Sequence, residues 1–161
     1  WTGAKVTGEH TGYVLLENGQ VYVNNNEVVG AKIKMDMSSI EVTDLEGEWK
    51  DKLVGHLKSD DFFSADKFPH AKFEITSFKN NDVTGDLTIK GITHEISFPA
   101  EVNIDGDNVT ALGTASIDRT KWDIKYGSGK FFSDLGDRMI KDEFEIKFEL
   151  SAKSSLELTT N

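Results

Sequence analysis

Four histidines are the side chains of this sequence best suited to bind a metal ion: His10, His56, His70 and His94. None stands two or four residues from another, the spacings at which one strand or one helical turn brings two imidazoles onto a common metal. A metal site assembled from distant segments stays open, and the alternative is that these histidines hydrogen-bond loop backbone. We therefore predict no metal site.

Adjacent carboxylates offer a second kind of chemistry, because two acidic side chains can supply the acid and the base of glycoside hydrolysis. Asp60 with Asp61 and Asp142 with Glu143 are such pairs. Among 28 Asp and Glu residues, however, coincidental pairs are expected, and a solvated surface is the simpler account. The tripeptide GSG at 127–129 has neither the G-x-S-x-G of a nucleophile elbow nor the spacing of a P-loop, so it predicts a turn.

The aromatic residues are more informative, with ten phenylalanines and three tryptophans in the chain. Phe62 and Phe63 are adjacent, as are Phe131 and Phe132, and both pairs follow charged or glycine-rich sequence. Neighbours on one strand point to opposite faces, so a single sheet surface cannot hide both rings of a pair. Either the rings plug the ends of a filled core, or they line the mouth of a cavity that holds an apolar ligand.

The elements that must position these rings are strands, because apolar and polar residues alternate with period two along most of the chain. About eight such runs, at spacings typical of an up-and-down barrel or a sandwich, predict an all-β fold. The apolar positions include Ala31, Ile33, Met35 and Met37; Ala71, Phe73 and Ile75; Val83, Gly85, Leu87 and Ile89; Ile96, Phe98, Ala100, Val102 and Ile104; Val109, Ala111, Gly113, Ala115 and Ile117; and Phe144, Ile146, Phe148, Leu150 and Ala152.

Three features interrupt this alternation. The Asn18–Gly19 dipeptide predicts a type I′ hairpin turn, which would pair Tyr13 and Leu15 with Val21 and Val23. In residues 44–57 apolar side chains recur every four positions, which predicts a helix; they are Leu45, Trp49, Leu53 and Leu57. Pro99 lies at a polar position of its strand and favours an edge or a bulge there.

Length and composition limit the function classes. A chain of 161 residues is long enough for one domain with its own core. Its formal net charge of -10 repels phosphate backbones and anionic lipid surfaces, so we expect no nucleic-acid partner. The absence of cysteine excludes disulfides and thiol catalysis, and no run approaches the about 18 apolar residues of a membrane span, so we expect no direct membrane insertion. Because the chain begins at Trp1, we expect a processed or trimmed product.

Several blocks of the sequence resemble the YceI-like family of polyisoprenoid-binding proteins. They are HLKSDDFFSADKFPHAKFEIT (residues 56–76), VTGDLTIKGITHEISFPAEV (83–102) and IDRTKWDIKYGSGKFF (117–132), with WTGAKVTGEHTG at the start and DMSSIEVTDL at 36–45. The blocks follow the order and spacing of the family and together cover nearly the whole chain.

The resemblance implies an eight-stranded, antiparallel, extended lipocalin-like barrel, with a short helical segment before HLKSDDFF, as one domain over residues 1–161. It implies a long apolar tunnel for a prenyl chain, no catalysis and no required cofactor beyond a bound polyisoprenoid or isoprenoid quinone. It also implies export to the bacterial periplasm or secretion, with the signal segment outside this chain. Family members usually have a short strand before the position of Trp1, which we expect to be absent or clipped here.

Binding, storage or transport of a long isoprenoid lipid is therefore the first hypothesis. The alternatives are a carboxylate-dependent hydrolase at the barrel mouth, with His56, Asp60 or Asp61 as catalytic groups, and a ligand-free structural or stress-related barrel with a filled core. A homodimer stays open, as does the question whether Phe62 or Phe63 faces the cavity. The predicted ligand-binding residues are Phe62, Phe63, Phe73, Ile75, Leu87, Ile89, Ile96, Phe98, Ile117, Trp122, Phe131, Phe132, Phe144, Ile146 and Phe148.

Overall fold

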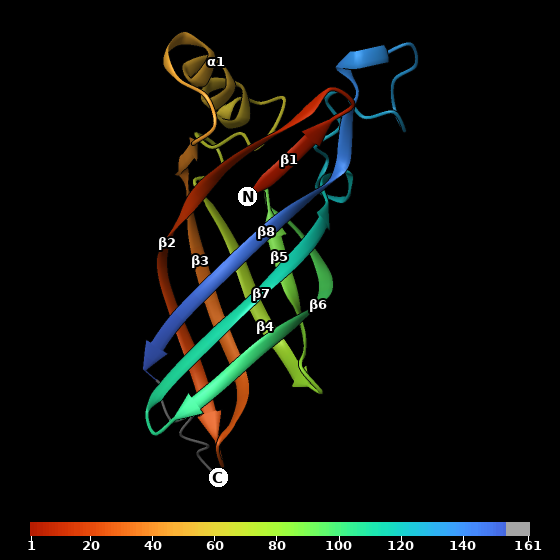
Figure 1. Ribbon diagram of the computed structural model, residues 1–161. Helices are drawn as coiled ribbons and strands as arrows, with labels where there is room; N and C mark the ends of the chain where they lie inside the picture. Colours follow the sequence, from red (N-terminus) through yellow and green to blue (C-terminus); the bar gives the residue numbers. More distant parts are fainter. Residues whose placement is uncertain (154–161) are drawn as a thin grey trace.

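The alternating sequence forms strands that close into an antiparallel barrel, seen in a computed structural model that describes residues 1–153 (Figure 1). The strands are β1 (Thr2–Lys5), β2 (Gly8–Asn24), β3 (Glu27–Val42), β4 (His70–Lys79), β5 (Asp82–Ile89), β6 (Ile92–Asp105), β7 (Asn108–Asp118) and β8 (Ile140–Lys153). One α-helix, α1 (Gly47–Lys58), follows β3, and two 3-10 helices, η1 (Arg119–Trp122) and η2 (Gly136–Arg138), lie between β7 and β8.

Each strand pairs with its neighbours in sequence, and β1 completes the ring by pairing with both β2 and β8. The inward side chains follow the predicted positions. On β5, Val83, Leu87 and Ile89 are buried, and along the whole of β8 half-buried and exposed residues alternate. A slip of one residue would turn these apolar side chains to water, so the alternation fixes the register. The predicted eight-stranded barrel is confirmed.

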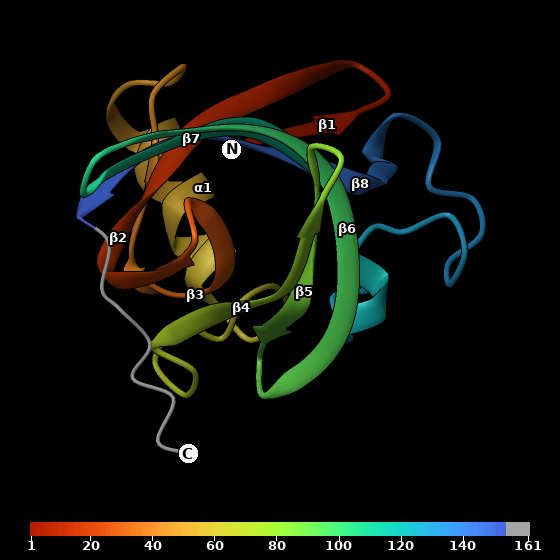
Figure 2. The same cartoon turned by 90° about the horizontal axis from the view of Figure 1, so that it is seen from below.

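The two ends of the barrel differ. At one, the hairpin end, the turns β2–β3, β4–β5 and β6–β7 connect the strands. At the other, the helix end, lie α1 and the segment that carries η1 and η2 (Figure 1). Figure 2 views the ring of strands from the hairpin end and shows α1 at its far end. A ligand inside the barrel would therefore meet short turns at one end and the helix at the other.

The hairpin turn predicted at Asn18–Gly19 is wrong. β2 runs through this dipeptide, and a register shift between Leu16 and Asn18 absorbs it as an irregularity of the strand. The turn lies instead at Asn25 and Asn26, whose φ angles of 49° and 62° are those that a type I′ turn requires. Asparagine tolerates this left-handed conformation better than most residues, so two consecutive asparagines serve here as well as Asn-Gly.

The predicted helix is confirmed as α1, but its apolar residues do not share one buried face. Leu57 is buried, whereas Trp49 is 71% exposed and carries Lys52 over its ring. A spacing of four residues turns about 40° further than one helical turn, so successive residues drift around the axis. Trp49 has drifted away from the face that buries Leu57.

β6, which contains Pro99, has a neighbour on each side in the closed barrel, but neither neighbour pairs with it along its whole length. β6 pairs with β5 as far as Pro99 and with β7 from Ala100 onward. The proline, which has no N–H to donate, thus lies where the strand changes its partner, and the ladder tolerates it there.

Candidate functional site

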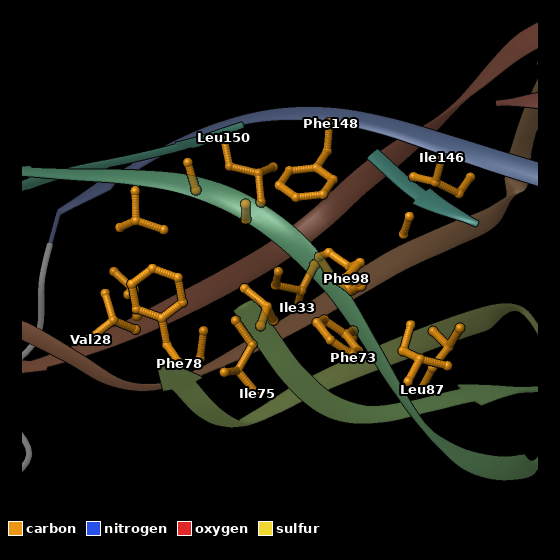
Figure 3. A pocket seen from close by; sticks show the side chains of 18 of the residues that line it. Val28, Ile33, Phe73, Ile75, Phe78, Leu87, Phe98, Ile146, Phe148 and Leu150 are labelled. Carbon is orange, nitrogen blue, oxygen red and sulfur yellow. The ribbon is translucent and has the colours of Figure 1, made fainter. Parts of the chain in front are cut away.

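The interior of the barrel contains a cavity of about 230 Å³ that extends from its middle to the hairpin end (Figure 3). Inward side chains of β2 to β8 form its wall, and every one is apolar: Leu16, Val21, Val28, Ala31, Ile33, Met35, Phe73, Ile75, Phe78, Val83, Leu87, Ile96, Phe98, Ala100, Val102, Val109, Ala111, Ala115, Ile117, Ile146, Phe148, Leu150 and Ala152. Such a wall can hold a hydrocarbon, but it offers no side chain for acid, base or nucleophilic chemistry.

A second cavity, of about 120 Å³, lies at the helix end. It is lined by Trp1, Gly3, Val14, Met35, Met37, Ile40, Leu57, Phe62, Phe63, Ala71, Leu87, Ile89, Ile117, Arg119, Ile140, Lys141, Phe144 and Ile146. Met35, Leu87, Ile117 and Ile146 line both cavities, so the two spaces are neighbours, with these four side chains between them. We call the two cavities together the tunnel.

Three phenylalanine rings cross the middle of the tunnel (Figure 3). The ring centroid of Phe98 lies 5.5 Å from that of Phe73 and 5.6 Å from that of Phe148. Two glycines make room for them: a Cβ on Gly85 would lie 2.8 Å from the Phe73 ring, and one on Gly113 would lie 2.8 Å from the Phe148 ring. The rings of Phe73 and Phe148 thus lie against bare backbone of β5 and β7.

Phe62 and Phe63 close the tunnel at the helix end, and both line its second cavity. They belong to a turn that follows α1, where the amide of Phe62 donates to the Ser59 carbonyl and that of Phe63 to the Leu57 carbonyl, both at 3.1 Å. In a turn, adjacent side chains need not point in opposite directions. The alternation of side chains that would place the two rings on opposite faces of a strand therefore does not apply to Phe62 and Phe63.

Arg119 is a buried charge in the wall of the helix-end cavity, with only 3% of its surface exposed. Its guanidinium donates to the carbonyls of Ile124 at 2.8 Å, Lys141 at 3.1 Å and Ile140 at 3.2 Å, and it lies 5.6 Å from the Phe62 ring. Burial lowers the pKa of Arg119, and the nearby charge of Asp142, 3.7 Å away, opposes that effect. The guanidinium of Arg119 thus donates its hydrogen bonds to backbone carbonyls.

Most of the predicted ligand-binding residues come together in the tunnel. The hairpin-side cavity includes Phe73, Ile75, Leu87, Ile96, Phe98, Ile117, Ile146 and Phe148, and the helix-end cavity adds Phe62, Phe63, Ile89 and Phe144. Trp122, Phe131 and Phe132 line neither cavity. Trp122 is fully buried and donates its indole N–H to the Leu87 carbonyl, while Phe131 and Phe132 are 48% and 50% exposed. The adjacent rings of Phe131 and Phe132 suggested a cavity mouth, but neither ring lines the tunnel.

Some lining residues escaped the prediction. Ile33 and Met35 stand at apolar positions of an alternating strand, so parity alone could have assigned them. Phe78 could not be found in this way, because the register shifts between Ile75 and Ser77 and reverses the parity beyond that point. Trp1 also lines the helix-end cavity, although it precedes β1.

The candidate catalytic groups do not form an acid–base site. His56 Nε2 lies 3.7 Å from an Asp61 carboxylate oxygen, and its ring packs on Phe62 and Tyr126. Asp60 is exposed and paired with Lys67, and a hydrogen bond from that lysine lowers the pKa of the carboxyl group. A general acid that works near neutral pH needs the opposite shift.

The histidines likewise have separate partners. His10 contacts Asp44 at 2.8 Å, His70 contacts Glu17 at 2.9 Å, and His94 hydrogen-bonds the Lys121 carbonyl at 2.9 Å. Within residues 1–153 no group of three or more histidine, aspartate or glutamate side chains is arranged to hold a metal ion. In the same part of the chain, no helix is long and apolar enough to cross a membrane.

Comparison with known proteins places this geometry in a family. Residues 2–152 match the model of the YceI-like domain. A UPF0312 protein of Staphylococcus aureus strain bovine RF122 is 41% identical over 108 residues, which cover 63% of this chain and 60% of the relative. The chain thus spans about 60% of the length of the curated relatives that it matches.

Solved structures share the fold. BcnA of Burkholderia cenocepacia has a TM-score of 0.64 at 27% identity, over 84% of this chain and 83% of its own. The YceI protein of Campylobacter jejuni has a TM-score of 0.64 at 17% identity, over 89% and 85% of the two chains. A domain of Saccharophagus degradans, described as a polyisoprenoid binding domain, has a TM-score of 0.64 at 13% identity, over 96% and 91%.

Proposed function

This chain belongs to the YceI-like domain family, and we propose that its barrel binds a long apolar isoprenoid lipid, of polyprenyl or isoprenoid-quinone type, for storage or transport. The observation that carries the proposal is the tunnel, whose two neighbouring cavities share Met35, Leu87, Ile117 and Ile146 in their walls. A barrel with a filled core would have no such space. The polyisoprenoid-binding domain of Saccharophagus degradans, which has the same fold, supports this choice of ligand.

The length of the tunnel favours a chain-like ligand. Phe144 lines the helix-end cavity and Ala152 the hairpin-side cavity, and eight residues separate them on β8. This separation is roughly 27 Å along the strand, and because barrel strands tilt by about 40° it is roughly 20 Å along the tunnel. A compact ligand would fill only part of such a path, whereas a long hydrocarbon can lie along it.

The wall of the tunnel fixes the kind of interaction. Because all residues around the hairpin-side cavity are apolar, binding there rests on the hydrophobic effect, about 0.8 kcal/mol for each CH₂ group removed from water. The methyl branches of a prenyl chain can pack against the rings of Phe73, Phe98 and Phe148, which line this cavity. Neither a metal nor another cofactor has a role in this mode of binding.

The test is to recover the lipid. The full chain is purified from a host rich in prenyl lipids and extracted with organic solvent, and the extract is analysed by mass spectrometry. We expect a prenyl lipid in stoichiometric amount, and we expect the stripped protein to bind added polyprenol or quinone in preference to a straight-chain alcohol of equal length. If no lipid is recovered from such a host and added quinone does not bind, the proposal fails.

We also propose that the protein acts in the bacterial periplasm or outside the cell, since the family resemblance implies export. Fractionation of the source cells checks this location. Recovery of the protein only with cytoplasmic markers would contradict it.

A further inference from the structure

The loop between η1 and β8, residues 123–139, displays two adjacent aromatic rings that the tunnel does not use. Phe131 and Phe132 are 48% and 50% exposed, and Met139 in the same loop is 37% exposed. Val6, 55% exposed in the turn between β1 and β2, donates its backbone N–H to the Met139 carbonyl at 3.2 Å. The loop lies at the helix end of the barrel, beside η2 and the start of β8 (Figure 1).

The exposure of the two rings does not follow from a loosely held loop. The backbone amides of Phe131 and Phe132 donate to the carbonyl of Ser128, a fully buried residue, at 3.1 and 3.0 Å. Arg119 holds both ends of the loop through its hydrogen bonds to the carbonyls of Ile124 and Ile140. The chain thus fixes two hydrophobic rings in water, an arrangement that marks interaction surfaces.

The charge of the loop indicates the kind of partner. The whole chain has a formal net charge of -10, but residues 123–139 carry three positive and three negative side chains and are neutral. They are Lys125, Lys130 and Arg138 against Asp123, Asp134 and Asp137. Lys125 also lies 5.1 Å above the Phe131 ring. The loop therefore lacks the negative excess of the rest of the chain, and an exposed aromatic pair without that excess suits the interface of a neutral bilayer, where phenylalanine rings can leave water.

The position of the loop connects it to the tunnel. Ile140 follows the loop directly, donates its amide to the Gly127 carbonyl at 2.8 Å, and lines the helix-end cavity. Tyr126 contacts the ring of Phe62, which closes the same cavity, at a centroid distance of 6.0 Å. A surface that engages this loop is therefore next to the helix end of the tunnel.

We propose that the Phe131–Phe132 surface docks this protein on the headgroup region of a neutral phospholipid bilayer. The rings enter the interface while the acidic remainder of the chain stays in water, which brings the helix end of the tunnel to the membrane. This role rests on the proposed function, because a membrane is the source or the destination of the lipid that the barrel would bind. No part of the chain needs to cross the bilayer.

Flotation of the full chain with phosphatidylcholine vesicles tests the proposal. We expect the protein to float, and the double variant Phe131→Ser/Phe132→Ser to lose vesicle binding by on the order of tenfold or more, because two half-exposed rings no longer leave water. Leu112→Ser, which removes an equally exposed side chain from β7, is the matched control and should float as the parent does. The single variant Phe131→Ser should lie between them, and circular dichroism confirms that each variant is folded.

Vesicle composition provides the second arm. An acidic protein held by hydrophobic rings should bind anionic phosphatidylserine vesicles more weakly than neutral ones at low salt. Stronger binding to anionic vesicles, equal flotation of the double variant and the parent, or a homodimer that the double variant abolishes without any flotation would each overturn the proposal. If prenyl lipid is recovered from a protein that does not float, the docking role is rejected and lipid binding is retained. If the protein floats but yields no prenyl lipid, lipid binding is rejected and docking is retained.

Discussion

Phe62 and Phe63, although adjacent in sequence, both line the helix-end cavity, and their ring centroids are 6.2 Å apart. The Phe63 ring also meets that of Phe144 on β8 edge to face, at 6.2 Å. Phe62 packs instead toward His56 of α1. The pair thus connects the helix to the barrel wall, and the tunnel is bounded at this end by rings that a ligand can touch.

Replacing Phe98 or Phe148 with tryptophan should weaken lipid binding while the fold survives. Both rings face the tunnel, so the added volume enters space that the ligand would fill. Displacing about two CH₂ groups of ligand would reduce affinity on the order of tenfold. Lipid titration and thermal denaturation of Phe98→Trp and Phe148→Trp measure the two effects, with Leu112→Trp on the outer face as control. A loss of 1 to 3 kcal/mol in stability, on the order expected for an overpacked core, with unchanged affinity would contradict the assignment.

Gly85→Ala should destabilise the barrel by about 1 to 3 kcal/mol, because the new methyl group overpacks its surroundings. Its Cβ would lie 2.5 Å from the Glu74 carbonyl oxygen and 2.8 Å from the Phe73 ring. Gly19→Ala in β2 is the control, since a Cβ there would come no closer than 3.6 Å to the Lys32 carbonyl oxygen. Urea unfolding compares the two variants. If Gly85→Ala and Gly19→Ala are equally stable, the strands around Gly85 move to accommodate the methyl group. The close packing of Phe73 on Gly85 would then not contribute to stability.

The inward positions of most strands could be predicted from the sequence, since a period of two is the direct consequence of strand geometry. Phe98 and Phe148 were found in this way, and Phe78 was missed where a register shift reverses the period. The prediction placed Phe131 with the tunnel because residue type alone does not say what a loop covers. The turn predicted at Asn18 was wrong because residue type permits a turn without requiring one. At Asn18–Gly19 the pairing of β2 with β3 continues through the dipeptide.

Removing the bound lipid should lower the stability of the protein. An empty cavity of about 230 Å³ forgoes on the order of 5 kcal/mol of packing energy, at about 24 cal/mol per Å³. A ligand that binds only the folded barrel also raises its stability by mass action. Denaturation of the stripped and the refilled protein measures the difference. If the two melt at the same temperature, the cavity is not the binding site.

Stability should fall in acid, in part through Asp118. Burial disfavours the ionised form of this residue, but hydrogen bonds from Thr120 and Lys130 outweigh it and hold its pKa below the ordinary value of 3.8. The unfolded chain then binds the proton first, so the stabilisation is present above about pH 4 and is lost as pH falls through the folded pKa.

Urea unfolding between pH 7 and pH 2 tests this dependence. Asp118→Asn should be less stable than the parent at neutral pH and should lose less stability on acidification. Asp107→Asn, in the turn between β6 and β7, is the control and should follow the parent. Parallel curves for the parent and Asp118→Asn would show that the ion pair with Lys130, at 2.9 Å, has no part in acid sensitivity.

The central claim, that a prenyl chain lies along the tunnel, is tested most directly by photolabelling. A prenyl alcohol that carries a photoreactive group at its far end is bound to the stripped protein and irradiated, and tandem mass spectrometry locates the modified residues. We predict labels on inward residues such as Phe98, Phe148 and Phe63, and their loss when an excess of unlabelled polyprenol competes. Labels confined to outward residues or to the Phe131–Phe132 surface, or labels that competition does not reduce, would contradict it.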